Sequence, residues 1–224
     1  MKLYLTPIVM LLVAAFTTGC KDRGVTEPAP PDTSGGPIDR KPNLYLYPTS
    51  KQTISVTLEF PHGGRILDSD PPYGSGWTVE VDPSGRINDR YDYLYYEAQT
   101  EDRYQYSSGW VVQKDTLHQF FLEVLSQAGF SGRETGDFLD YWIPRLHASN
   151  FYAVYPQGSE QIENLIKLAI SPHPTSLLRL FFVIEALHQN TPALAQPVAL
   201  PSAASAPTPA VAKPVEKPAE TKKE

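Results

Sequence analysis

The chain has 224 residues, with 19 basic and 25 acidic side chains, which gives a formal net charge of −6 at pH 7. Lysine and arginine are spread along the chain and form no long basic run. Proteins that bind nucleic acid usually carry a basic patch or stripe, so this composition argues against a nucleic-acid partner. An anionic membrane surface would also repel a chain of this charge.

The first 19 residues have the order of an export signal. Lys2 precedes an apolar stretch over residues 3–16, and the small residues 17–19 precede Cys20, the only cysteine of the chain. A membrane-spanning helix needs about 20 apolar residues, and this stretch is shorter. We therefore expect residues 1–19 to be a signal peptide.

Cys20 and the residues before it resemble the lipobox of bacterial lipoproteins, in which the cysteine sulfur receives a diacylglycerol and the new amino terminus is acylated. Each buried methylene contributes about 0.8 kcal/mol, so two or three acyl chains anchor a protein firmly. The resemblance implies lipidation of Cys20 and attachment to a membrane of the bacterial cell envelope, either the outer membrane or another extracytoplasmic face. The alternative is a secreted protein with a free thiol.

Two segments flank a region of ordinary composition. Residues 20–41 are rich in proline and glycine and predict a flexible tether that follows the lipidated cysteine. Residues 190–224 are rich in alanine, proline and lysine and predict a disordered tail. Residues 42–189 have the size of one globular domain.

The first half of this domain has the period of two that is typical of strands. Ile54, Val56 and Leu58 alternate with polar residues, which predicts a strand with one packed face. A strand over residues 77–81 runs into Asp82-Pro83-Ser84-Gly85, a turn sequence from which a returning strand is expected. Three other strands are expected around residues 44–46, 91–98 and 110–112.

The period then becomes helical. Apolar residues at helical spacing predict a helix over residues 117–128, with Asp115 as the expected cap at its start and Gly129 at its end. Ser131 and Glu134 have the spacing of a capping box and predict a second helix that ends near Pro144. The two helices are expected to form a hairpin over one side of the sheet.

Strands are expected again after the helices, over residues 151–155, around 166–170 and over 177–187. The last of these is almost entirely apolar, so we expect it to lie centrally in the sheet. The order of elements predicts a single domain of the α+β class, with a mostly antiparallel sheet and an inserted helical hairpin.

Residues 41–48 have the sequence Lys-Pro-Asn-Leu-Tyr-Leu-Tyr-Pro. This segment resembles the K-P-x-(Ile/Leu)-Y-L-Y-P opening of an uncharacterised bacterial family of exported and lipid-anchored proteins. Further segments agree in order: Gly76-Trp77 and residues 93–97, 109–112, 141–144 and 174–181. The resemblance implies a location in the envelope, and it carries no activity, ligand or catalytic residue.

The strand expected over residues 91–98 places Tyr91, Tyr93, Tyr95 and Glu97 on one face. Flat aromatic rings beside a carboxylate suit a sugar, whose C–H face stacks while its hydroxyls bond the acid. We expect Trp77 and Trp110 to extend this surface, so the ligand-binding candidates are Tyr93, Tyr95, Glu97, Trp77 and Trp110. The alternative is that the tyrosines only pack under the helical hairpin.

Two charged residues have further expected roles. Glu97 is the candidate catalytic acid of a glycoside hydrolase, which would need a second carboxylate across the bond, and Glu80, Asp92 or Glu59 could supply it. Arg179 lies in the most apolar segment, so we expect it to form a structural ion pair with a carboxylate, Glu97 being one candidate. The histidines lack the spacing of a helical metal site, and we expect no metal or cofactor.

Together these features predict a lipid-anchored protein of the bacterial envelope. Its domain is expected to be a non-catalytic module that binds a cell-wall glycan or another envelope protein. The alternative is a cell-wall-active glycoside hydrolase that uses Glu97.

Overall fold

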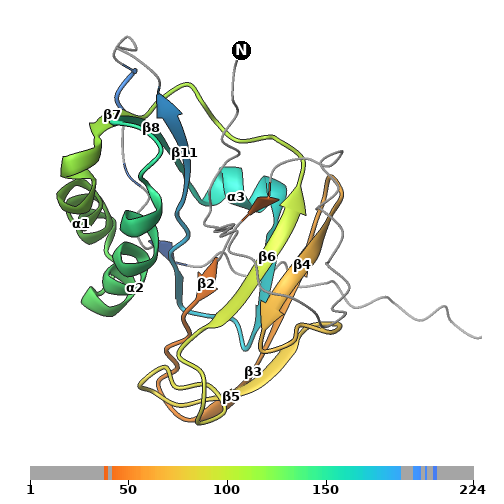
Figure 1. Ribbon diagram of the computed structural model, residues 1–224. Helices are drawn as coiled ribbons and strands as arrows, with labels where there is room; N and C mark the ends of the chain where they lie inside the picture. Colours follow the sequence, from red (N-terminus) through yellow and green to blue (C-terminus); the bar gives the residue numbers. More distant parts are fainter. Residues whose placement is uncertain (1–37, 40–41, 188–193, 198–199, 201–203, 206–224) are drawn as a thin grey trace, which may run out of the picture.

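The computed structural model describes residues 38–39, 42–187, 194–197, 200 and 204–205 (Figure 1). The predicted signal peptide, Cys20, and most of the predicted tether and tail lie outside the described residues. The described part contains helices and antiparallel strands around two adjoining cores, which confirms the predicted single α+β domain with an inserted helical hairpin.

The first sheet is built around β6 (Leu94–Thr100), with β4 (Gly64–Asp70) on one side. On the other side, β1 (Ile38–Asp39) pairs near the end of β6, and β2 (Asn43–Leu44) pairs near its start. β6 therefore begins and ends later than the strand predicted over residues 91–98, and Tyr91 forms an isolated bridge with Ile87 instead.

The second sheet has β3 (Gln52–Glu59) between β5 (Trp77–Val81) and β9 (Lys167–Ser171). The predicted alternation is confirmed in β3, since Ile54 and Val56 are buried while Thr53 and Thr57 are exposed. After β5, Gly85 adopts the expected positive φ of 86°. The expected returning strand is reduced to a single bridge between Val81 and Ile87.

The third sheet has β8 (Phe151–Gln157) between β7 (Trp110–Gln113) and β11 (Phe181–Leu187). The expectation that the last apolar run lies centrally is wrong, because β8 has that position. β11 is nevertheless apolar on both faces, since Phe182 and Ile184 join the core under the helices and Val183 joins the core of the other two sheets. β11 is apolar along its whole length because each of its two faces packs against a hydrophobic core.

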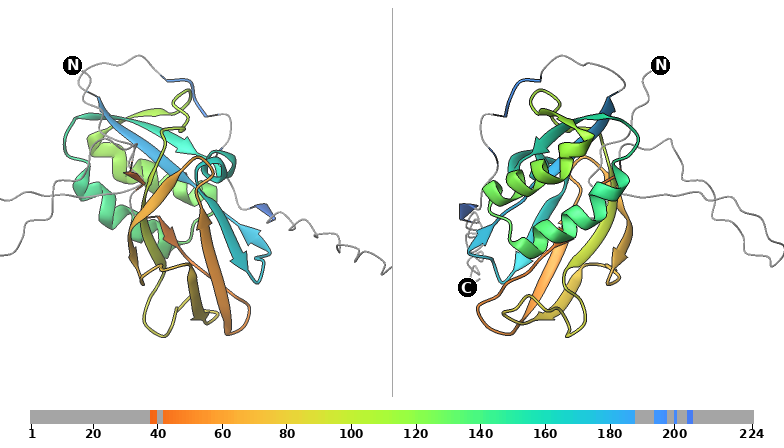
Figure 2. Two further views of the ribbon diagram at one scale, coloured as in Figure 1. Left: turned by 90° about the vertical axis from the view of Figure 1, so that its right-hand side faces the viewer. Right: turned by 60° about the vertical axis from the view of Figure 1, so that its left-hand side comes forward.

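The helical hairpin consists of α1 (Leu117–Ala128) and α2 (Gly132–Trp142), which cover the outer face of the third sheet (Figure 2). Short 3₁₀ turns precede and follow it, η1 (Lys114–Thr116) and η2 (Ile143–Arg145). Gly129 ends α1 with a φ of 101°, and Ser131 and Glu134 form the predicted capping box. Asp115 is not the cap, because it lies inside η1 and the helix starts without a side-chain cap.

A third helix, α3 (Ser159–Leu165), follows β8 and was not predicted. Its seven residues include only two buried apolar side chains, Ile162 and Leu165, which is too few for a clear helical period. It brings Glu163 into the domain, with consequences for Arg179 described below.

Ordered contacts extend beyond both predicted domain boundaries. Within the segment predicted as a tail, Ala195 pairs with Ser108, and the Gly109 amide donates to the Ala195 carbonyl over 2.8 Å. Leu194 and Leu200 are partly buried against the two cores. Further along, β12 (Ala204–Ser205) pairs with β10 (Ser176–Leu177). The described contacts of the domain therefore extend to Ser205 and, through β1, to residues before the expected start at 42.

A chain that ends at Gln189 should be less stable than one that ends at Ser205. The shorter chain loses two half-buried leucines, Leu194 and Leu200, so we expect its free energy of unfolding to fall by about 1–3 kcal/mol. Urea unfolding of the two chains measures the difference. Equal midpoints would show that the carboxyl-terminal contacts add no stability.

Candidate functional site

The two faces of β6 have different environments. Its inner face, formed by Leu94, Tyr96, Ala98 and Thr100, is buried in the core. Its outer face carries Tyr95 and Glu97, and Tyr93 comes just before the strand; all three are half-buried. The structure therefore places these three candidates together, and it leaves them partly open to solvent.

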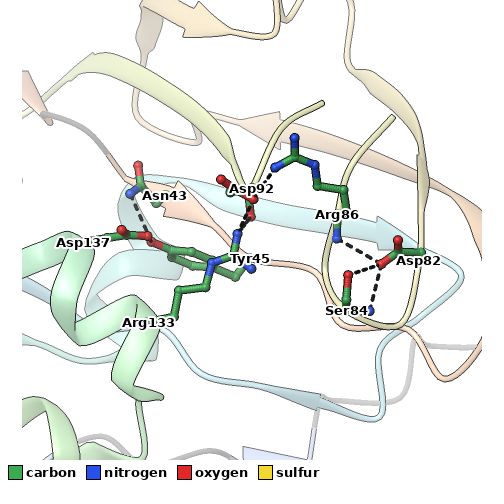
Figure 3. Close-up of polar contacts among 8 residues, drawn as sticks. All are labelled: Asn43, Tyr45, Asp82, Ser84, Arg86, Asp92, Arg133 and Asp137. Atoms are coloured by element: carbon green, nitrogen blue, oxygen red, sulfur yellow. Dashed lines mark hydrogen bonds and ion pairs between the residues drawn. The ribbon is translucent and has the colours of Figure 1, made fainter. Parts of the chain in front are cut away.

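Tyr45 joins this group from the segment after β2. Its hydroxyl donates to Asp137 Oδ2 of α2 over 2.6 Å (Figure 3). Its ring centroid lies 5.4 Å from that of Tyr93. Asn43 Nδ2 donates to the same hydroxyl over 3.4 Å. Burial, and then the hydrogen bond to Asp137, raise the pKa of Tyr45 well above its ordinary value.

An ion-pair cluster holds the start of α2 beside this surface. Asp92 accepts from Arg133 of α2 over 2.6 Å and from Arg86 of the turn after β5 over 2.8 Å (Figure 3). The three side chains are partly exposed, so each pair contributes at most about 1 kcal/mol. Their effect is mainly geometric, because they link the helical hairpin to the first two sheets.

Tyr95 and Glu97 form the most polar part of the surface. The Tyr95 hydroxyl donates a hydrogen bond to the Glu97 carboxylate. Burial is the main cause that raises the pKa of Tyr95, and the bond to Glu97 and the charge of Asp68 raise that pKa further. Asp68 and Asp70 of β4 are exposed and lie directly opposite Glu97 and Tyr95 in the pairing of β4 with β6.

Two residues that the sequence did not assign to the site are Tyr141 of α2 and Arg145 of η2. Tyr141 is close enough to Tyr95 to affect its ionisation. The Arg145 guanidinium carbon lies 3.6 Å from the centroid of the Tyr141 ring, and Arg145 Nη1 donates to the Tyr141 carbonyl. Residues four apart lie on the same face of a helix. The sequence has this spacing at Arg133, Asp137, Tyr141 and Arg145, which indicates that their side chains lie on one side. We define the tyrosine face as Tyr45, Tyr93, Tyr95, Glu97 and Tyr141.

The structure corrects the expectation that Trp77 and Trp110 extend this surface. Trp77 is only 3% exposed, and its ring packs against Tyr73 and against Tyr96 on the inner face of β6. Its period of two with Val79 and Val81 was the signal for this buried position. Trp110 belongs to the third sheet and packs on Phe120 of α1, at 5.2 Å between ring centroids.

Arg179 forms the expected structural ion pair, and its partner is Glu163. Arg179 is 7% exposed, with Nη1 2.6 Å from Glu163 Oε2 of α3 and Nη2 donating to the Ile166 carbonyl over 2.9 Å. It also bonds the Tyr96 hydroxyl on the inner face of β6, whereas Glu97 belongs to the outer face. Burial lowers the pKa of Arg179, and Tyr96 and Glu163 oppose that shift.

The carboxylates considered as hydrolytic partners of Glu97 are held by cations elsewhere. Glu59 pairs with Lys167 over 3.3 Å, Glu80 pairs with Lys51 over 2.6 Å, and Asp92 binds the two arginines described above. Asp68 is the carboxylate that strand pairing places opposite Glu97. Among the described residues, no group of three or more metal-binding side chains is arranged to hold an ion.

No family model, curated protein or solved structure that we compared matches this chain. Of the helices that the structure describes, none has both the length and the apolar character needed to cross a bilayer.

The raised pKa values of Tyr45 and Tyr95 predict a loss of stability in alkali. In the unfolded chain a tyrosine hydroxyl ionises at about pH 10. The folded protein holds the hydroxyl protons of Tyr45 and Tyr95 more tightly, because their pKa values are raised. The stability that these two protonated hydroxyls contribute is therefore fully present below about pH 10, and it is lost as the pH rises above that value. Urea midpoints measured on both sides of this pH should show the fall, and Tyr95→Phe should reduce it. A fall of the same size in Tyr95→Phe would contradict the assignment to Tyr95.

Proposed function

We propose that this chain is a lipid-anchored protein of the bacterial envelope whose domain binds a glycan through the tyrosine face. The observation that carries the proposal is the hydrogen bond from Tyr95 to Glu97 on the half-exposed side of β6. An aromatic ring offers a stacking surface to the C–H face of a sugar, and the adjacent carboxylate accepts from its hydroxyls.

The surroundings of these two residues support a ligand with many hydroxyl groups. Asp68 and Asp70 provide acceptors at the β4 side, and the tyrosine hydroxyls provide donors. The net charge of −6 disfavours polyanionic partners such as nucleic acid. A neutral glycan carries no negative charge that the protein would repel. Each of its hydroxyls can donate to the carboxylates and accept from the tyrosine hydroxyls.

The anchor at Cys20 remains part of the proposal, and the topology is compatible with it. The chain joins the described domain at β1, whose residues pair with Ala98 and Gln99 at the far end of β6. Glu97 comes directly before Ala98, so the tether would enter the domain beside the tyrosine face.

Tyr95→Ala should weaken retention on isolated envelope glycan by about tenfold, because the substitution removes the stacking ring and the partner of Glu97. Tyr106→Ala is the matched control, since Tyr106 is an exposed tyrosine bonded to Asp102 outside the tyrosine face. Sedimentation with the insoluble glycan measures retention. Equal retention by both variants would refute the proposed role of the face.

Glu97→Gln separates binding from hydrolysis. The amide retains an acceptor oxygen, so retention should persist at a reduced level, and no release of reducing sugar is expected from either protein. Release of sugar by the native chain that is lost in Glu97→Gln would favour the hydrolase instead.

Cys20→Ser should move the protein from the membrane fraction to the soluble fraction, because it removes the sulfur that carries the lipid. Mass spectrometry of the native protein should find acyl chains on Cys20 and no residues before it. An unmodified thiol would contradict the anchor while leaving glycan binding open to its own test.

A further inference from the structure

The tyrosine face continues onto β4 as a row of carboxylates. In the pairing of β4 with β6, Asp70 lies opposite Tyr95 and Asp68 lies opposite Glu97. Residues opposite each other in an antiparallel pair project to the same side of the sheet, with Cβ atoms about 5 Å apart. Both aspartates are exposed. We define the carboxylate row as Asp68, Asp70 and Glu97, and it borders the Tyr95 ring.

The charges of this row repel one another. Like charges directly opposite in a strand pair are destabilising, as Asp68 and Glu97 are here. The exposed Glu59 and Glu80 are each paired with a lysine. Within the part of the chain that the structure describes, neither Asp68 nor Asp70 has a salt bridge. A cation at this edge of the face would relieve the repulsion.

The rest of the tyrosine face offers aromatic rings. The rings of Tyr45 and Tyr93 meet edge to face with centroids 5.4 Å apart, and Tyr141 of α2 is close enough to Tyr95 to affect its ionisation. Surfaces lined by aromatic rings commonly dock proline-rich segments, because the polyproline II conformation is preformed and little entropy is lost on binding. Rings beside carboxylates therefore fit a proline-rich segment that carries a cation.

This chain has such a segment directly after its last described strand. Residues 206–218 read Ala-Pro-Thr-Pro-Ala-Val-Ala-Lys-Pro-Val-Glu-Lys-Pro, and we call them the proline segment. It has four prolines, and its two lysines and one glutamate give a net charge of 2 − 1 = +1. This charge is opposite in sign to that of the carboxylate row.

The proline segment starts from a point that is fixed on the domain. Ser205 of β12 pairs with Ser176 of β10, and the segment begins at the next residue. Its 13 residues span about 40 Å in polyproline II geometry. A domain of about 160 residues has a diameter of about 40 Å, so the segment can reach another face of its own molecule. Attachment at one end gives it an effective concentration in about the millimolar range, at which weak contacts suffice.

We propose that the proline segment docks on the tyrosine face of its own molecule and that a glycan must displace it to bind there. The prolines pack on the tyrosine rings, and Lys213 and Lys217 approach the carboxylate row. The docking stands on the contacts above, whereas the competition rests on the glycan-binding function proposed in the previous section. The segment thereby regulates access to the site.

Paramagnetic broadening of NMR signals tests the docking directly. The lipid-free chain from residue 21 has no cysteine, so Ala212→Cys gives it a single position for a nitroxide label inside the proline segment. The label should broaden the amide signals of Tyr93, Tyr95 and Glu97, independently of protein concentration. Broadening confined to the residues around β10, where the segment is attached, would overturn the proposal. Broadening of the face that grows with concentration would show docking between molecules and overturn the intramolecular arrangement.

Charge reversal in the tail assigns the docking to the proline segment. Lys213→Glu combined with Lys217→Glu should reduce the broadening at Tyr95 by at least about threefold, because like charges then meet at the carboxylate row. Lys222→Glu combined with Lys223→Glu makes the same change of charge outside the segment and should leave the broadening unchanged. Equal reductions in the two double variants would indicate general charge attraction and overturn the assignment.

A matched pair of variants tests the carboxylate row. Asp68→Asn should reduce the broadening at Tyr95 by at least about twofold, because it removes one of the two opposed charges. Asp115→Asn removes an exposed carboxylate of η1, outside the tyrosine face, and should have no effect. Circular dichroism checks that both variants fold. Native broadening in Asp68→Asn would overturn the role of the row.

Retention on isolated envelope glycan separates this inference from the function beneath it. The variant with Lys213→Glu and Lys217→Glu should be retained about threefold more strongly than the native chain, because its tyrosine face is uncovered. Equal retention of the two chains, without broadening at the face, overturns the docking and leaves glycan binding in place. Broadening at the face, without retention of either chain, refutes glycan binding and leaves the docking in place.

Discussion

The domain depends on the two-sided character of β6, where neighbouring tyrosines have opposite roles. Tyr96 is 1% exposed and bonds Arg179, whose charge is in turn neutralised by Glu163. This arrangement satisfies a cation inside the core, where an unpaired charge would be prohibitive. Tyr95, one residue earlier, belongs to the half-exposed outer face and bonds Glu97 there. A shift of one residue in the pairing of β6 would exchange these two environments, so packing of the inner face fixes what the outer face displays.

The helical hairpin has two functions in this arrangement. Its apolar side packs on the third sheet, with Phe121 and Trp142 almost fully buried. The other side of α2 faces the tyrosines, where Asp137 bonds Tyr45 and Arg133 bonds Asp92. Hydrophobic burial supplies most of the stability of such a helix, and the polar contacts determine its position relative to β6. The tyrosine face is thus assembled from two layers, and neither layer alone contains it.

The sequence predicted local structure well where one physical signal dominated. The alternation in β3, the helical spacing of α1 and the capping box at Ser131 all appear as expected. Positions that depend on tertiary structure were harder. The central place of β8 and the pairing of Arg179 with Glu163 need the sheet order and α3, which periodicity does not encode. Arg145 was overlooked because Pro144 suggests a helix end, although η2 continues the turn and keeps Arg145 above Tyr141. The position of Trp77, by contrast, was available from its alternation with Val79 and Val81.

The strand edges of this domain are protected against pairing with another chain. β4 pairs only with β6 among the described strands, and an unprotected edge of this length would invite pairing with another chain. Its register shifts between Ile66 and Asp68, and exposed charges at Arg65, Asp68 and Asp70 oppose strand addition. At the start of β7, the backbone of Gly109 is already bonded to Ala195. Backbone pairing is therefore disfavoured at these two edges. Side chains are thus what these surfaces leave exposed, and in the tyrosine face aromatic rings and a carboxylate come together from the segment after β2, from β6 and from α2.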